Sequence, residues 1–251
     1  MFAELSTDPV FWALAVVAVT LTGISKGGLG GMAILSVPLL SLRISPVEAA
    51  AVMLPILVVM DWTGLLAYRR HWDRGLVKLI LPAAIVGVGI GWALAGSVSE
   101  NGVRIAVGVV AVAFPLWQWF GPARGIESLR GSRIAGVVAG VVAGFTSFVA
   151  HAGGPPFKAY ALAQGLPPRI FAGTSVVVFT AINAAKLVPY AALGQLGTAN
   201  LATSLVLVPL APLGVLLGVW LVKRMDAAVF YRIIYALVFA TGCKLLWDGL
   251  F

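Results

Sequence analysis

Two glycine-rich breaks interrupt long apolar stretches of this chain at matching places in its two halves. The first is GISKGGLGG at residues 23–31, and the second is GFTSFVAHAGGPP at residues 144–156. Each break carries one ionisable residue, Lys26 or His151, among residues that are otherwise soluble in lipid. Irregular backbone at membrane depth is tolerated only where protein or a wet cavity satisfies its polar groups. Paired breaks in two related halves are therefore typical of the binding site of a transporter.

Composition supports a membrane protein. Of the 251 residues, 61% are hydrophobic and only 10% are charged, with a mean hydropathy of +1.02; soluble domains carry about 25% charged residues. The net charge of +8 comes mainly from short connections, which indicates membrane topology and not a nucleic-acid surface. The single cysteine, Cys243, leaves no disulfide or cysteine-based metal cluster to expect, and we expect no cofactor. The N-terminus is acidic and lacks the basic region of a cleaved signal, so we expect the first apolar segment to persist.

The lengths of the apolar segments predict the helices. The segments are 8–24, 31–43, 46–68, 75–97, 102–120, 132–150, 154–164, 168–193, 199–222 and 227–249. A crossing needs roughly 20 residues, so 31–43 and 154–164 are too short and 8–24 is marginal. These pieces flank the breaks, which predicts helical hairpins over 8–43 and 132–164 with a break at each tip. Two interpretations remain open: re-entrant hairpins, or pairs of short complete spans with a tight connection.

The positions of the basic residues predict an inverted arrangement of the two halves. Lys and Arg cluster at 69–78, 124–133 and 223–232, whereas the connections 98–101 and 194–199 have none. The positive-inside rule places the basic connections in the cytoplasm. The first hairpin then enters and leaves from outside and the second from inside, provided that each returns to its own side. We therefore expect an all-α integral membrane protein with two inverted repeats, each a hairpin followed by three transmembrane helices.

The sequence itself carries a weak trace of this duplication. Aligning Pro46 with Pro168 puts Asp61 opposite Asn183, and a second alignment puts Gly87 opposite Gly214. Gly, Pro and Ala are abundant here, so the matched order of the segments is the stronger argument. The predicted units are a first transmembrane repeat at 1–120, a cytoplasmic linker at 121–131 and a second repeat at 132–251.

The chemistry of the tips favours a small anion. Each tip is followed by a short helix, and a helix N-terminus offers unpaired N–H groups and partial positive charge. Glycines let successive N–H groups form an anion-binding nest, and Lys26 adds a full charge where a lone cation is expensive. The predicted tip contacts are Lys26, Gly27, Gly28, Gly30, Gly31, His151, Gly153 and Gly154.

Blander interpretations stand beside these. Lys26 could snorkel to a nearby surface, and His151 could be a neutral residue bonded to a backbone carbonyl. Under the repeat, Asp61 and Lys186 fall about one turn apart, so we expect them to pair, either structurally or as a proton-coupling or gating element. Further polar residues, which either join helices or line a pathway, follow one segment: Thr174, Ser175, Thr180 and Asn183. Asn183 is a third candidate for coupling or gating, with Asp61 and Lys186.

At these residues the chain resembles the sulfite exporter TauE/SafE family, also called the toluene-sulfonate uptake permease superfamily. The second half carries Gly153-Gly154-Pro155, Gly165-Leu166-Pro167-Pro168 and Gly173-Thr174-Ser175. The first half carries Gly27-Gly28-Leu29-Gly30-Gly31, Val37-Pro38 and Ser45-Pro46, but has Ala51-Val52-Met53 in place of the Gly-Thr-Ser. His151 also departs from the commonest family pattern. The resemblance implies transport of sulfite or organosulfonates across the plasma membrane, with proton coupling.

These observations together predict a secondary transporter of a small sulfur-containing anion, with protons as the coupling ion and no nucleic-acid partner. The anion is expected between Lys26 and His151, with Thr174 and Ser175 as further contacts. The alternative is a passive anion channel, whose flux would ignore a proton gradient. A membrane enzyme is disfavoured because no Cys–His or His-rich cluster occurs, and a scaffold would not need paired broken helices.

Overall fold

The computed structural model describes residues 8–29, 32–68, 70–121, 129–221 and 227–251, and all regular structure in these ranges is helical. The first half contains α2 (Pro9–Ile24), a π-helical turn η1 (Ser25–Leu29), a 3-10 turn η2 (Met32–Leu35), α3 (Ser36–Leu40), α4 (Pro46–Tyr68), α5 (Arg74–Ala95) and α6 (Glu100–Phe120). The second half contains α7 (Arg133–Ala150), α8 (Gly154–Ala163), α9 (Pro168–Ala192), α10 (Thr198–Leu207), α11 (Leu210–Leu221) and α12 (Ala227–Leu250).

Local signals set several of these helix starts. Asp8 caps α2 by accepting hydrogen bonds from the N–H groups of Val10 and Phe11. Ser45 and Glu48 form a reciprocal capping box at the start of α4, with both hydrogen bonds at 3.2 Å. Further side-chain caps are Asp73 on α5, Ser99 on α6 and Ser132 on α7.

Seven of the described helices are long and apolar enough to cross a membrane, and the count is eight if the bent pair α10–α11 forms one span. The segment 199–222, predicted to be long enough for a full span, is divided into α10 and α11, which meet at an angle of 44°. The break falls at Val208 and Pro209. Proline lacks an N–H and clashes with the preceding turn, which accounts for the break.

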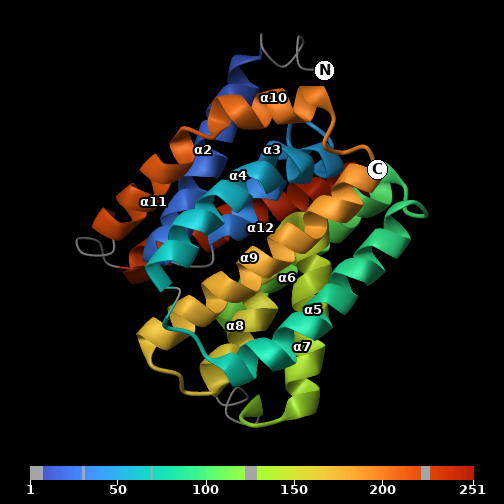
Figure 1. Ribbon diagram of the computed structural model, residues 1–251. Coiled ribbons are helices and arrows are strands. Elements are labelled where there is room, and N and C mark those ends of the chain that lie inside the picture. Colours follow the sequence, from blue (N-terminus) through green and yellow to red (C-terminus); the bar gives the residue numbers. More distant parts are fainter. Residues whose placement is uncertain (1–7, 30–31, 69, 122–128, 222–226) are drawn as a thin grey trace.

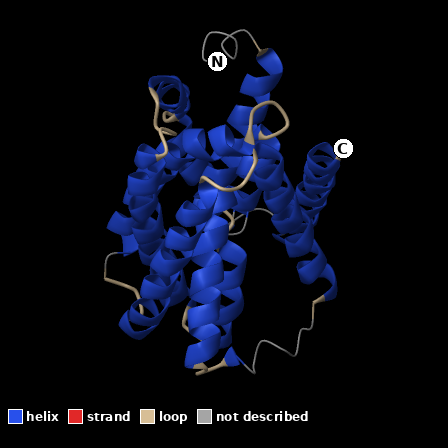
Figure 2. Cartoon of the chain, turned by 90° about the vertical axis from the view of Figure 1, so that its right-hand side faces the viewer, coloured by secondary structure: helices blue, strands red, loops and turns tan. Residues whose placement is uncertain are grey.

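The two hairpins have arms of unequal length. The stretch Pro9–Gly27, which includes the start of the π-helical turn, and α7 are each candidate spans, whereas α3 and α8 have only 5 and 10 residues. Segment 8–24, expected to be marginal, is therefore long enough once the π-helical turn extends it. The start of α2 and the end of α12 lie at one end of the molecule (Figures 1 and 2), while the α4–α5 and α8–α9 connections lie at the other.

Each hairpin packs against a helix from the other half of the chain. Helix α7 lies along α5, and α2 lies along α11. Glycine makes both approaches possible: a Cβ on Gly144 would lie 1.9 Å from the Ala84 carbonyl oxygen, and one on Gly23 would lie 2.7 Å from Gly214 backbone atoms. Gly136 and Gly140 likewise pack against α5 side chains or backbone. Gly136, Gly140 and Gly144 thus form a packing face of small residues on α7.

The centre of the molecule is the contact between α4 and α9, which run side by side (Figure 1). The two hairpins flank this pair, so their tips approach side chains in the middle of both helices. Polar residues buried there include Asp61, Asn183 and Lys186. The fold therefore brings the two glycine-rich breaks and the central polar residues of the long helices into one region.

Candidate functional site

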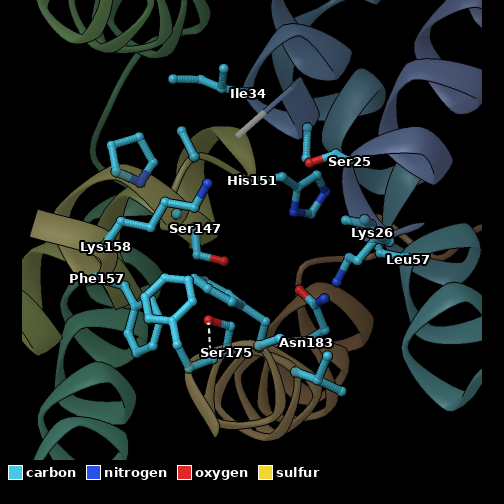
Figure 3. Close-up of a pocket in the computed structure, with 18 of the residues that line it drawn as sticks. Ser25, Lys26, Ile34, Leu57, Ser147, His151, Phe157, Lys158, Ser175 and Asn183 are labelled. Atoms are coloured by element: carbon cyan, nitrogen blue, oxygen red, sulfur yellow. Dashed lines mark hydrogen bonds between the residues drawn. The ribbon is translucent and has the colours of Figure 1, made fainter. Parts of the chain in front are cut away.

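A cavity of about 520 Å³ lies between the two hairpins and α9. Figure 3 shows residues from both halves of the chain around it. Much of the wall is apolar or aromatic and includes Phe157, Phe171 and Phe179. The lining residues with an amide, hydroxyl or basic side chain are Ser25, Lys26, Tyr68, Ser147, His151, Lys158, Ser175 and Asn183. Among the described lining residues there is no Asp or Glu.

Lys26 enters the cavity from the π-helical turn and is held by Asp61 behind the wall. The Lys26 ammonium forms an ion pair with Asp61 Oδ1; the side chains are 20% and 2% exposed. Asn183 on α9 donates a hydrogen bond of 2.6 Å to the other oxygen, Oδ2. One carboxylate thus joins the first tip, α4 and α9, and its charge offsets that of Lys26.

The prediction that Asp61 and Lys186 form an ion pair is wrong. Lys186 is fully buried, and its ammonium donates to the Ser147 carbonyl oxygen at 2.9 Å and to Ser147 Oγ at 3.1 Å. Its third contact is His151 Nδ1, at 2.6 Å. Helix packing explains the difference. The end of α7 brings Ser147 and His151 to Lys186, while Asp61 contacts Lys26 and Asn183.

His151 sits at the second tip in a left-handed conformation, with φ of 52°, and is the only non-glycine residue with positive φ in the described ranges. Because an ammonium only donates, Nδ1 accepts from Lys186. Nε2 then carries the ring proton and donates it to the Ala50 carbonyl oxygen at 2.9 Å. Both nitrogens are therefore occupied in this conformation, as in the interpretation of a neutral histidine bonded to a backbone carbonyl.

The remaining predicted contacts separate into wall residues and packing residues. Gly154 and Ser175 line the cavity. Thr174, one residue earlier, is fully buried; its Oγ1 donates to the Ile170 carbonyl and accepts from the Asp73 N–H at 2.8 Å. Gly153 also packs, since a Cβ there would lie 2.5 Å from the Ala143 carbonyl oxygen. Thr174 and Gly153 thus hold the wall in place from outside the cavity.

The first-half glycines are only partly described. Gly27 and Gly28 belong to the π-helical turn, which continues α2 towards the tip. Gly30 and Gly31 lie outside the described residues. The predicted nest of N–H groups at this tip therefore stays a prediction.

Sequence reasoning missed Lys158 and the aromatic wall. Lys158 lies on α8, in the short apolar segment after the second break, and lines the cavity. The same signal that selected Lys26, an ionisable residue beside a glycine-rich break, would have found it. The aromatic residues had no such signal, because Phe is common in membrane helices for packing alone.

Comparison with known proteins identifies the family. Residues 15–245 match the family described as sulfite exporter TauE/SafE. No curated protein and no solved structure gives a significant match. Members of the matched family are membrane transporters and not enzymes, and membership suggests the export of sulfite or a sulfonate. The match covers most of the chain and confirms the resemblance drawn from the glycine-rich motifs, so the protein belongs to the TauE/SafE family of sulfite exporters.

Proposed function

We propose that this protein is a secondary transporter that moves sulfite or an organosulfonate across the plasma membrane through the cavity between the two hairpins. The observation that carries the proposal is the composition of the cavity wall. The described charged residues of the wall are Lys26 and Lys158. Asp61, which pairs with Lys26, is not among the lining residues. A cation in an apolar, water-poor setting attracts an anion far more strongly than it would in water.

The size and polarity of the cavity suit such anions. Its volume lies within the range of about 300 to 1,000 Å³ that is typical of small-molecule pockets. The polar residues can face the oxygen atoms of a sulfite or sulfonate group. Phe157, Phe171 and Phe179 offer an apolar surface for an organic substituent. Organosulfonates are therefore included in the proposal together with sulfite.

An inverted repeat of residues 1–120 and 132–251, joined by a cytoplasmic linker at 121–131, underlies the proposed transport cycle. Asp61 and Asn183, which the sequence alignment puts opposite each other, are hydrogen-bonded to each other. A two-fold axis brings equivalent residues together in this way. The α2–α11 and α5–α7 contacts support the same pairing, since the alignment puts Gly214 opposite Gly87 and both lie in these contacts.

Proton coupling is proposed to pass through Asp61. An anion that approaches Lys26 competes with Asp61 for the same ammonium. In this proposal a proton replaces the Lys26 ammonium as the partner of the displaced carboxylate. Anion binding and proton uptake would thus occur together at the Lys26–Asp61 pair. The alternative function, a passive anion channel, lacks this link.

The proposed direction is export from the cytoplasm. Leu166 and Pro168 line the cavity and belong to the α8–α9 connection and the first residue of α9. That connection lies at the same end as the α4–α5 connection (Figure 1), which carries Arg70 and is followed by Arg74 at the start of α5. By the positive-inside rule this end is cytoplasmic. The cavity therefore extends towards the side from which an exporter loads its substrate.

Flux into proteoliposomes tests the function. We expect the purified protein to carry labelled sulfite and sulfoacetate, and a pH gradient to change the rate. Lys26→Ala should abolish most of this flux, whereas the matched variant Lys244→Ala should not, since Lys244 pairs with Asp248 at the far end of α12. Equal flux with and without the gradient would favour the channel, and unchanged flux in Lys26→Ala would refute the proposed site.

A further inference from the structure

Three lysine ammonium groups lie in or behind the cavity, and two of them have partners. Lys26 is paired with Asp61. Lys186 contacts Ser147 through two oxygens and His151 through Nδ1. Lys158 lines the cavity and has no hydrogen-bond or ion-pair partner within the described part of the chain. Among the described residues it is therefore the one of the three lysines without a hydrogen-bond or ion-pair partner.

The surroundings of Lys158 make this charge costly. Its side chain is half-buried on α8, and the neighbouring wall contains Phe157, Leu162 and Phe171. A cation removed from water needs a partner to offset its lost hydration. Figure 3 shows Lys158 reaching into the cavity from the side opposite Lys26. Since no described residue supplies a partner, an anion bound in the cavity is the partner that this position favours.

We propose that Lys158 is the cation that binds the transported anion in this conformation, ahead of Lys26, whose charge Asp61 already offsets. The proposal rests on the proposed function and adds the residue that determines resting affinity. Ser147 is the second donor: its Oγ accepts from Lys186, so its own O–H proton stays available to an anion. His151 contributes no donor, because its ring N–H is bonded to Ala50.

This role predicts opposite effects of one substitution on affinity and on stability. Lys158→Gln removes an unpartnered cation, so the anion-free protein should unfold at the same temperature as the wild type or at a higher one. The same variant should bind sulfite about 10- to 100-fold more weakly, as expected when a hydrogen bond to a charged group is lost. A lysine with a structural role would instead lower the unfolding temperature of the anion-free protein.

The experiment measures thermal unfolding of the detergent-purified protein against the concentrations of sodium sulfite and sodium methanesulfonate. Binding to the folded state raises the unfolding temperature with ligand concentration. Lys158→Arg keeps the charge and should stay within about threefold of wild-type affinity, a difference well under 1.4 kcal/mol. Lys244→Gln makes the same change outside the cavity and should bind as the wild type does.

The outcomes separate the inference from the function. Wild-type affinity in Lys158→Gln overturns the role of Lys158, and so does a loss of affinity that occurs in Lys26→Met but not in Lys158→Gln. Neither result contradicts the proposed transport function. A lowered unfolding temperature of anion-free Lys158→Gln also overturns it. If the wild type neither binds nor carries either anion, the proposed function fails and the inference fails with it.

Discussion

The two hairpins share an architecture but differ in how they treat charge. The first tip carries a lysine that is neutralised by a carboxylate on the neighbouring long helix, α4. The second tip carries His151, which is held by neutral and cationic partners, and its cavity cation lies farther along, on α8. The first tip is thus a closed ion pair, whereas the second half presents an unpaired cation. This difference is the basis for proposing that the first half couples transport to protons and that the second half sets resting anion affinity.

Departures from the proposed repeat would account for this division. Ser147 and Lys186 cooperate in the second half, whereas position 64, which the alignment puts opposite Lys186, is glycine. The first half therefore has no lysine on α4, and its cation comes from the tip instead. Two related hairpins can in this way supply unequal sites to one cavity.

Breaking the ion pair of the first tip should give the largest effect. Asp61→Ala leaves the Lys26 ammonium and the Asn183 amide without their partner. Removing one member of a buried pair costs about 3–5 kcal/mol, and we expect the lower end because Lys26 is 20% exposed. Unfolding in detergent measures the loss. The double variant Lys26→Met with Asp61→Asn should recover most of the stability but no transport.

The second half provides the contrast for this prediction. Lys186→Met removes donors from Ser147 and His151, both of which are neutral, so it leaves no unpaired buried charge. Its cost should be about 1–3 kcal/mol, as for unsatisfied neutral groups, and smaller than that of Asp61→Ala. A larger loss in Lys186→Met would reverse the assignment of charge pairing to the first tip.

Substitutions of the packing glycines of the two hairpins should give the next largest losses of stability. Gly144→Ala places a Cβ 1.9 Å from the Ala84 carbonyl oxygen, whereas Gly23→Ala meets Gly214 backbone at 2.7 Å. Overpacking costs about 1–3 kcal/mol, and Gly144→Ala should lie at the upper end. Gly89→Ala, with nothing within 4 Å, is the control on α5. Equal unfolding temperatures for all three variants would contradict the tight packing of both hairpins.

The sequence predicted most helix limits, because the length of an apolar run and the caps around it are local. Positions that depend on neighbouring helices were not predictable. The alignment that puts Gly87 opposite Gly214 also puts Pro82 opposite Pro209. Helix α5 nevertheless continues through Pro82, whereas α10 and α11 are separated at Pro209. Thr174 and Ser175 are adjacent, but only Ser175 faces the cavity, since α9 turns Thr174 towards Asp73.

The partner of Asp61 shows the same limit. The sequence predicted Lys186 as the partner of Asp61, but in the fold Lys186 contacts Ser147 on α7 and Lys26 pairs with Asp61. The cavity cations were predictable in kind, as lysines near glycine-rich breaks. Which of them is free to bind an anion depends on contacts that only the folded chain creates.

The smallest effect should arise where the arms of each hairpin meet. Arg43 donates hydrogen bonds to Asp8, which joins α2 to the segment after α3 and holds the pKa of that carboxyl below its ordinary value of 3.8. A lowered pKa in the folded state means that the stabilisation is present at neutral pH and is lost as pH falls through the folded value. In the second hairpin, Gln164 joins α8 to the Gly131 N–H without a charge. We therefore expect Asp8→Asn to lower the unfolding temperature slightly at pH 7 and low salt, and not in acid or high salt, where protonation or screening already removes the pair. Gln164→Ala should lower the unfolding temperature equally under all these conditions. A pH-dependent loss of stability in Gln164→Ala, or a pH-independent loss in Asp8→Asn, would contradict the contrast between the two hairpins.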